Sequence, residues 1–303
     1  MCSQAEQTVI LGTSGGRGSN APARKPMPAR LGRYELTHEL GKGAMGVVYQ
    51  GRDPRINREV AVKAIPLADE FDPEDLEQAR TRFFREAEMA GRLSHPHIVT
   101  IYDAGEDGGT AYIAMELLRG QHLVEYTSAS RLLPTAVAIE IVARLADALH
   151  YAHQNQVVHR DIKPANIMFD APSGELKITD FGIARLTDSG RTRTGVVLGT
   201  PSFMSPEQLQ GRPVTGRSDL FSLAVSLYQL LTGQLPFRGD TMPGLMMKIA
   251  LEPHPRICAI NPALPPGLDT FFDRALAKDP AARYDSGASF AQALRDLNLP
   301  DKR

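Results

Sequence analysis

Four polar side chains carry most of the chemistry that this sequence makes available, and they stand in two short loops between apolar runs. Asp161, Lys163 and Asn166 share the first loop, and Asp180 opens the second. A carboxylate can orient an attacking hydroxyl and accept its proton, while a cation steadies an anionic group in transfer. A carboxylate and an amide also supply the hard oxygen ligands that Mg²⁺ prefers. Together these residue types suit the transfer of a phosphoryl group.

The order and spacing of the two loops resemble the protein kinase family. The run His159–Asp161 with Asn166 after it, followed by Asp180-Phe181-Gly182, matches the family's catalytic and metal-binding motifs. Either half alone could be a chance polar loop, but both in this order leave little room for chance. The resemblance covers about 34–299, nearly all of the chain outside its N-terminal tail.

The resemblance implies a role for each of these side chains. Asp161 would act as the base, with Lys163 beside the transferring phosphate. Asn166 and Asp180 would hold the Mg²⁺ that accompanies ATP, with Mn²⁺ as an alternative ion. Asp219, which also suits the start of a helix by its charge, would tie down the backbone of the His159–Asp161 loop.

Glycines form a turn between the first two predicted strands, 34–40 and 46–52. Such a turn lets backbone N–H groups approach phosphates, but dinucleotide-binding folds share it and then start a helix. Here the chain continues as strand and a third strand follows at 58–65, which favours the kinase arrangement. The resemblance implies ATP contacts at twelve positions: Leu40, Gly41, Lys42, Gly43, Ala44, Gly46, Val48, Ala61, Lys63, Met115, Glu116 and Leu118.

Lys63 lies on the third predicted strand and faces away from Val60 and Val62. A strand lysine is usually a solvated edge charge. In the family the matching lysine binds the α- and β-phosphates and pairs with a glutamate on the next helix, predicted here over 73–93. Glu86 aligns best with that glutamate, since Glu88 lies about 200° round the helix.

The segment after that helix predicts two more strands, 98–103 and 111–116. Met115-Glu116-Leu117-Leu118 matches the family's hinge, where backbone groups of Glu116 and Leu118 would bond adenine and Met115 would close the back of the pocket. The histidines of Ser94-His95-Pro96-His97 suggest a metal site, but a third ligand is missing nearby. We therefore interpret them as structural.

The second half of the chain is predicted to be mainly helical, with helices at 134–153, 220–231, 268–278 and 286–297. Ser205-Pro206-Glu207 stands where the family usually has Ala-Pro-Glu. Glu207 is expected to form a buried ion pair with Arg283 and so to anchor the end of the segment that follows Asp180.

Residues 186–195 are small, polar and charged, which predicts a mobile segment. Thr192 and Thr194 lie there at the position where bacterial kinases carry phosphorylated threonines, and Arg160 marks members that respond to such a phosphate. We predict self-activation at one or both threonines; Thr187 and Ser189 are weaker candidates. The alternative is that both threonines are merely solvated. Thr200 is expected to be a structural partner of Asp161 and Lys163.

Composition agrees with a protein of this kind. The 303 residues carry a net charge of -1, so no global field indicates nucleic acid or membrane as a partner. Two cysteines are too few for a disulfide framework. A cytoplasmic protein is expected, with no membrane segment in this chain, although a longer chain with an anchor remains open. Residues 1–30 are rich in Gly, Ser, Ala and Pro and predict a disordered tail.

These features predict a two-lobed α+β kinase domain over 31–300. An antiparallel sheet with one helix (33–117) would precede a mainly helical lobe (118–299). Lys163-Pro164 and Gly199-Thr200-Pro201 resemble the serine/threonine class, and Gly182-Ile183-Ala184-Arg185 resembles its bacterial members. Protein substrates are the expected partners, with transient self-association during autophosphorylation. A pseudokinase scaffold and a small-molecule phosphotransferase stay open as alternatives.

Overall fold

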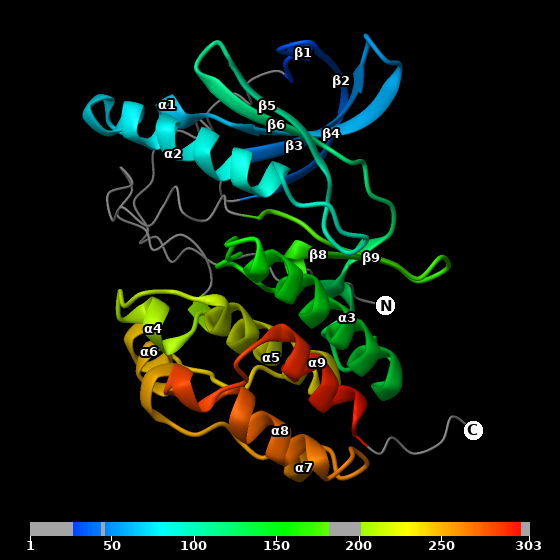
Figure 1. The fold of residues 1–303 in the computed structure, drawn as a ribbon, viewed down its shortest axis with the longest axis vertical. Helices are drawn as coiled ribbons and strands as arrows, with labels where there is room; N and C mark the ends of the chain where they lie inside the picture. Colours follow the sequence, from blue (N-terminus) through cyan, green and yellow to red (C-terminus); the bar gives the residue numbers. More distant parts are fainter. Residues whose placement is uncertain (1–26, 44–45, 182–200, 298–303) are drawn as a thin grey trace, which may run out of the picture.

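The computed structural model of the chain describes residues 27–43, 46–181 and 201–297. Its two parts lie one above the other, with the large sheet at one end and most of the helices at the other (Figure 1). The first part is a six-stranded antiparallel sheet in the order β1-β2-β3-β4-β6-β5. The strands are β1 Arg30–Leu31, β2 Tyr34–Gly43, β3 Gly46–Asp53, β4 Arg58–Ile65, β5 Ile101–Asp107 and β6 Thr110–Met115.

The strands predicted around the glycine turn are confirmed. β2 is longer than expected and includes Gly41 and Gly43, so the β2–β3 hairpin closes at the pair Gly43↔Gly46. β4 lies between β3 and β6, which places Lys63 opposite Val48 on one side and Ile113 on the other. Arg30, the last residue of the predicted tail, pairs with Glu35 in the sheet.

β5 begins three residues later than the sequence predicts. Ile98 instead forms an isolated parallel bridge with Ile178, and the Val99 N–H donates to the Ile178 carbonyl at 2.9 Å. The Val99 N–H is therefore satisfied by the second lobe and not by a neighbouring strand of the large sheet. Ile98 and Val99 therefore connect the large sheet to β9, the strand that leads into Asp180.

Helix α2 (Pro73–Gly91) packs its apolar face against the sheet. Its buried residues are Ala79, Phe83, Ala87 and Ala90, and the first three join a core cluster with Ile65, Leu67, Phe71, Ala111 and Ile113. Pro73 at the first helical position has no N–H to satisfy, which suits a helix start. The short α1 (Leu67–Glu70), which was not expected from the sequence, precedes it.

The second lobe is built around two long helices. These are α3 (Thr135–Gln154) and α5 (Gly216–Thr232), and α5 is buried along nearly its whole length. The other helices are α4 Pro206–Leu209, α6 Met242–Leu251, α7 Ile257–Ile260, α8 Gly267–Ala275 and α9 Gly287–Arg295. Helix α6 was not expected from the sequence, because Pro243 and Gly244 in its first turn are residues that usually mark turns.

A small three-stranded sheet lies between the lobes and carries the predicted loops. It consists of β7 (Gln121–His122), β8 (Ile167–Asp170) and β9 (Glu175–Ile178), and Figure 1 shows β8 and β9 between the large sheet and α3. The loop with Asp161 precedes β8, and Asp180 follows β9. Both loops are therefore held at the junction of the two lobes.

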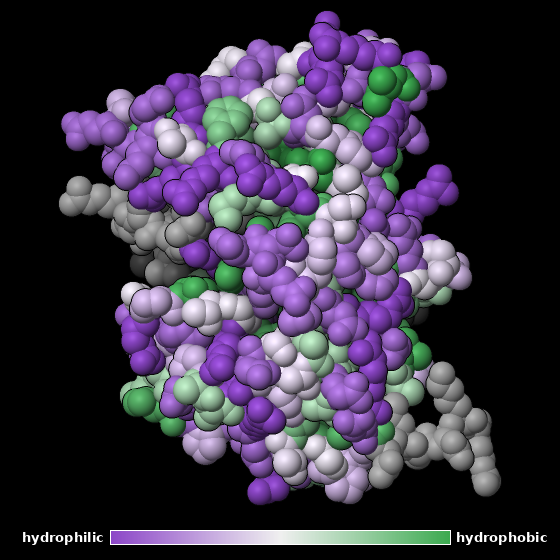
Figure 2. Space-filling model, viewed as in Figure 1, coloured by the Kyte–Doolittle hydropathy of each residue, from purple (hydrophilic) through white to green (hydrophobic). Residues whose placement is uncertain are grey.

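The outer surface of the face in Figure 2 is mostly hydrophilic, with apolar residues in small separate groups. No helix among the described residues is long and apolar enough to cross a membrane. The predictions for the tail before residue 27, for Ala44 and for Thr192, Thr194 and Thr200 fall outside the described ranges.

Candidate active site

The backbone that leads into Asp161 is held by Asp219, as expected from the sequence. Asp219 accepts from the His159 N–H at 2.9 Å through Oδ2 and from the Arg160 N–H at 2.7 Å through Oδ1. His153 Nε2 lies 2.8 Å from the same Oδ2. Burial by itself would raise the pKa of Asp219, but the contact with His153 and the loop amides keep it below its ordinary value. The carboxylate therefore stays charged and keeps binding the loop.

Two residues of the site have left-handed backbones, Arg160 with φ 72° and Asp180 with φ 63°. Such conformations cost on the order of 1 kcal/mol or more in non-glycine residues and persist where the surroundings impose them. His159 connects the two loops. Its Nε2 lies 2.7 Å from the Thr179 carbonyl oxygen, and its ring packs edge-to-face with the Phe181 ring, with 4.6 Å between the ring centroids. The two loops thus form one packed unit.

Asp161 is held in place by the two polar residues that follow it in the loop. Lys163 Nζ donates to Asp161 Oδ2 at 2.8 Å, and Asn166 Nδ2 donates to the same oxygen at 2.9 Å and to the Asp161 carbonyl at 2.8 Å. The Asp161 side chain is 40% exposed, whereas Asn166 is buried. A carboxylate that is held by hydrogen bonds and remains partly exposed to solvent can accept the proton of a substrate hydroxyl.

The side chain of Lys63, on β4 in the first lobe, contacts Asp180 in the second lobe. Its Nζ lies 2.7 Å from Asp180 Oδ1, and the lysine side chain is only 9% exposed. Burial would raise the pKa of Asp180, but the neighbouring Lys63 charge outweighs it and holds that pKa below the ordinary value. Asp180 therefore remains a carboxylate at neutral pH.

The partner of Lys63 differs from the one that the sequence suggests. Glu86 lies half-buried on α2. Among the described residues, Lys63 forms an ion pair with Asp180. Sequence alignment identifies which helical glutamate could pair, but it does not determine which carboxylate the lysine contacts. The catalytic role of Glu86 stays a prediction.

An apolar cluster stands next to Lys63. Ala61 and Met115, opposite each other on β4 and β6, are buried with Val99, and Val48, Leu117 and Leu118 pack against them. Four of the twelve predicted ATP contacts are thus brought together as an apolar group suited to a planar base. Leu40, Gly41, Lys42 and Gly43 lie exposed on the β2 end of the hairpin.

Gly46 closes that hairpin with a backbone that other residues avoid. Its φ is 148°, and a Cβ added there would come within 2.0 Å of the Ala64 carbonyl oxygen. Only glycine fits this position, because both the conformation and the space exclude a side chain. The glycine is therefore needed for the shape of the hairpin, whatever else it contacts.

Glu116 has structural contacts that no motif in the sequence predicts. Its Oε2 accepts from Lys177 Nζ at 2.9 Å and from the Thr100 N–H at 3.2 Å. Lys177 is a buried lysine on β9, three positions before Asp180. The hinge segment is thus tied to the strand that leads to Asp180. The only hint in the sequence is a charge in the apolar run Leu176-Lys177-Ile178.

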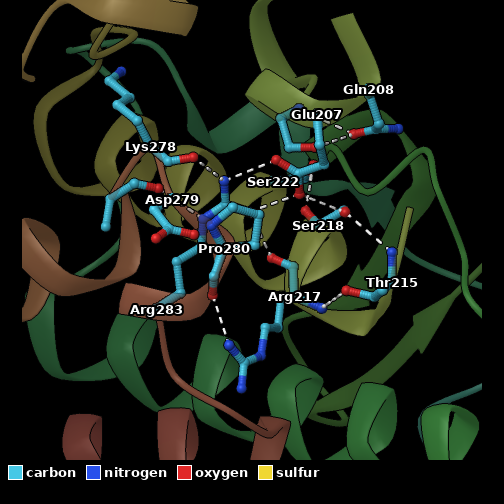
Figure 3. Close-up of polar contacts among 12 residues, drawn as sticks. Glu207, Gln208, Thr215, Arg217, Ser218, Ser222, Lys278, Asp279, Pro280 and Arg283 are labelled. Carbon is cyan, nitrogen blue, oxygen red and sulfur yellow. Dashed lines mark hydrogen bonds and ion pairs between the residues drawn. The ribbon is translucent and has the colours of Figure 1, made fainter. Parts of the chain in front are cut away.

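The predicted pair of Glu207 and Arg283 is present and fully buried (Figure 3). Arg283 donates to both oxygens of Glu207 at 2.8 Å, and its remaining N–H groups go to the carbonyls of Ala277, Arg217 and Lys278. All five guanidinium donors are used. Burial would raise the pKa of Glu207, but the bonds from Arg283 and Ser218 hold it below its ordinary value.

The two predicted metal ligands have suitable chemistry for a hard cation. Asn166 uses its Nδ2 for Asp161, so its amide oxygen is the atom that it can offer to a metal. Asp180 uses Oδ1 for Lys63 and has a second carboxylate oxygen. Hard oxygen donors of this kind suit Mg²⁺ or Mn²⁺. No cluster of three or more His, Cys, Asp or Glu that could hold a metal occurs within the described ranges.

Comparison with known proteins agrees with this geometry. Residues 34–296 match the family described as "Protein kinase domain". The serine/threonine-protein kinase PrkC of Bacillus subtilis is 40% identical over 256 residues, which cover 84% of this chain but only 39% of PrkC. The PknA kinase of Mycobacterium tuberculosis is 39% identical over 87% of this chain and 61% of its own length. The chain thus spans less than two thirds of these relatives.

Solved structures of kinases have the same fold. The crystal structure of the Mycobacterium tuberculosis PknI kinase domain superposes with a TM-score of 0.72 at 34% identity, covering 88% of this chain and 97% of that one. The sequence-based prediction of a two-lobed fold, with an antiparallel sheet in one lobe and helices in the other, is confirmed. The chain therefore belongs to the protein kinase family.

Proposed function

We propose that this chain is the catalytic domain of a serine/threonine protein kinase, which transfers the γ-phosphoryl group of ATP to serine and threonine hydroxyls of proteins. The observation that carries the proposal is the exposed Asp161 carboxylate, held by Lys163 and Asn166 beside the Lys63–Asp180 pair. The kinase names of its relatives support the serine/threonine class.

Each side chain has a defined part in the proposed transfer. Asp161 orients the substrate hydroxyl and accepts its proton as the oxygen attacks the γ-phosphorus, and the bond from that phosphorus to the β–γ bridging oxygen breaks to release ADP. Lys163, already bonded to Asp161, places a positive charge beside the transferring group. Lys63 binds the α- and β-phosphates. Asp180 and Asn166 would hold Mg²⁺, which would supply positive charge to the phosphate oxygens.

The nucleotide is proposed to lie with its base against the apolar cluster of Ala61, Val99 and Met115. Backbone groups of Glu116 and Leu118 would bond the adenine. The bond between Glu116 and Lys177 supports this placement, because it fixes the position of the hinge segment. A structure of Rad53 in complex with AMP-PNP superposes with a TM-score of 0.71 at 25% identity, covering 86% of this chain and 64% of that one.

A protein substrate is favoured over a small molecule by the way residues 201–209 are anchored. Glu207 is tied to Arg283, and Ser222 donates to the Phe203 carbonyl at 2.6 Å. A small-molecule phosphotransferase has no need for such a fixed segment next to the catalytic loop. A pseudokinase scaffold is disfavoured because Lys63, Asp161 and Asp180 are all present.

Phosphate transfer from labelled ATP separates the three functions. The protein would be incubated with Mg²⁺ and either a generic basic protein or a panel of small alcohols and sugars. Label on serine or threonine of the protein supports the proposal. Label on a small molecule alone would indicate a small-molecule phosphotransferase, and nucleotide binding without any transfer would indicate a scaffold.

Asp180→Asn is expected to weaken binding of Mg²⁺-ATP by roughly tenfold or more, because it removes a charged metal ligand and the partner of Lys63. Binding of ATP in EDTA should change much less. Calorimetric titration of nucleotide with and without Mg²⁺ measures both values. Equal losses in the two conditions would contradict a metal role for Asp180.

We also propose that the domain switches itself on by phosphorylating Thr192, Thr194 or both, through transient self-association. A phosphate adds about −1.5 to −2 charge, enough to pair with an arginine such as Arg160. Mass spectrometry should find phosphate in 186–195 of the wild-type protein and none in Lys63→Met. Adding active enzyme to Lys63→Met should restore it. A fully active wild type without phosphate there would end this proposal.

A further inference from the structure

Gln208 on α4 joins two segments that are far apart in the sequence. Its Nε2 donates to the carbonyl of Arg160 at 2.8 Å. Its Oε1 accepts from the N–H and from the hydroxyl of Ser205, both at 3.0 Å. The orientation of the amide follows from its partners, because a carbonyl needs a donor and an N–H needs an acceptor. Gln208 lies in the group drawn in Figure 3.

Capping of the α4 N-terminus uses only the amide oxygen of Gln208. In a capping box, Ser at the N-cap and Glu or Gln three residues later satisfy each other's backbone N–H groups, and Glu does so as well as Gln. Ser205 and Gln208 form such a box. The oxygen of Gln208 therefore accounts for the cap. Its NH₂ group contributes nothing to the cap and serves the contact with Arg160.

The carbonyl that Gln208 holds belongs to the peptide immediately before Asp161. On the opposite side of that peptide, the Asp161 N–H lies 3.2 Å from His159 Nδ1. The preceding N–H, that of Arg160, goes to Asp219. With φ of Arg160 at 72°, this peptide plane is in a conformation that its surroundings must impose. Gln208 supplies the contact on the carbonyl side, from the segment with which we propose that protein substrates dock.

We propose that Gln208 is a positioning residue that couples residues 201–209 to Asp161 by fixing the Arg160–Asp161 peptide plane. This inference rests on the proposed function. The Asp161 carboxylate has its catalytic orientation when α4 is packed in this position. The Glu207–Arg283 pair holds α4 there. Substrate docking and orientation of the base are thereby one structural event, carried by a single amide NH₂.

A pair of substitutions separates the two halves of Gln208. Gln208→Glu keeps an acceptor for Ser205 and places an acceptor against the Arg160 carbonyl. Gln208→Lys keeps a donor for that carbonyl and loses the cap acceptor. Gln210→Glu is the matched control: it makes the same chemical change two residues along, at an exposed position.

We expect Gln208→Glu to lower kcat for a protein substrate by roughly tenfold or more, since small misplacements of a reacting group have large effects. Its KM for ATP and its melting temperature should stay close to those of Gln210→Glu. Gln208→Lys should melt lower and yet retain a higher kcat than Gln208→Glu. The reverse order of kcat, with Glu the more active, would show that Gln208 serves only as a cap.

A second readout does not depend on any activity. The chain has three Arg-Asp dipeptides, at 52–53, 160–161 and 295–296. Labelling arginine with ¹³C at the carbonyl and aspartate with ¹⁵N therefore leaves three carbonyl-edited amide signals. We expect Gln208→Glu to move the Asp161 signal and leave the other two in place. An unmoved Asp161 signal overturns the inference, whereas a wild type without transfer activity contradicts the proposed function instead.

Discussion

Replacing Asp161 by asparagine is expected to lower kcat for phosphoryl transfer by roughly 10²–10⁴-fold, the usual contribution of a positioned general base. The amide cannot accept the hydroxyl proton, although its oxygen can still take the hydrogen bonds of Lys163 and Asn166. No phosphate contact is assigned to Asp161. The dissociation constant for Mg²⁺-ATP should therefore stay within a few-fold of wild type.

Single-turnover kinetics and nucleotide titration on the same preparations measure the two quantities separately. Asp147→Asn is the control for the chemical change, because Asp147 lies on α3 and pairs with Arg295 near the surface. An Asp161→Asn variant with nearly normal kcat would remove Asp161 from the mechanism. A parallel loss of nucleotide affinity would assign it to binding instead.

Arg283→Met is expected to destabilise the domain by about 3–5 kcal/mol, because it leaves the buried Glu207 carboxylate without its cationic partner. For a domain of this size, a loss of that magnitude corresponds to roughly 6–20 °C in melting temperature. Arg283→Lys should recover only part of it, since an ammonium cannot replace five planar donors that all have acceptors. Differential scanning calorimetry of the three proteins makes the comparison.

A double variant and a pH series test the cause of that loss. Glu207→Leu combined with Arg283→Met should be more stable than Arg283→Met alone, because no charge stays buried. The pKa of Glu207 is lowered in the folded wild type, so its contribution is complete above about pH 5 and is lost as the pH falls through the folded pKa. The stability gap between wild type and Arg283→Met should therefore narrow in acid. A gap that widens there would point to lost packing.

Much of the fold follows from local sequence signals. The strands around the glycine turn, the helix from Pro73 and the core of α3 have strong hydrophobic periodicity, and the structure places them within a few residues of expectation. The failures have local reasons as well. Ile98 and Val99 have strand-forming side chains, yet the Ile98 N–H donates to the His95 carbonyl and the Val99 N–H donates to Ile178 in the other lobe.

The site is only partly accessible from the sequence. Motif spacing was enough to expect Asp219 at the catalytic loop and Glu207 beside Arg283, and both contacts are present. Motif spacing did not predict the partner of Lys63. The choice between the Glu86 and Asp180 carboxylates depends on the positions of α2 and β9 relative to β4. Lys177 and Gln208 belong to none of the catalytic motifs of the family. Lys177 contacts Glu116, which is 61 positions away in the sequence, and Gln208 contacts Arg160, which is 48 positions away.

The central claim is that the loop with Asp161 transfers phosphate from ATP to protein hydroxyls. Its most direct measurement is a phosphoamino-acid analysis of an acceptor protein after incubation with γ-labelled ATP and Mg²⁺, together with the ADP formed in the same reaction. We predict one ADP for each phosphoserine or phosphothreonine formed by the wild type, and almost none by Asp161→Asn. Label on tyrosine alone, ADP without phosphoprotein, or undiminished transfer by Asp161→Asn would contradict the account.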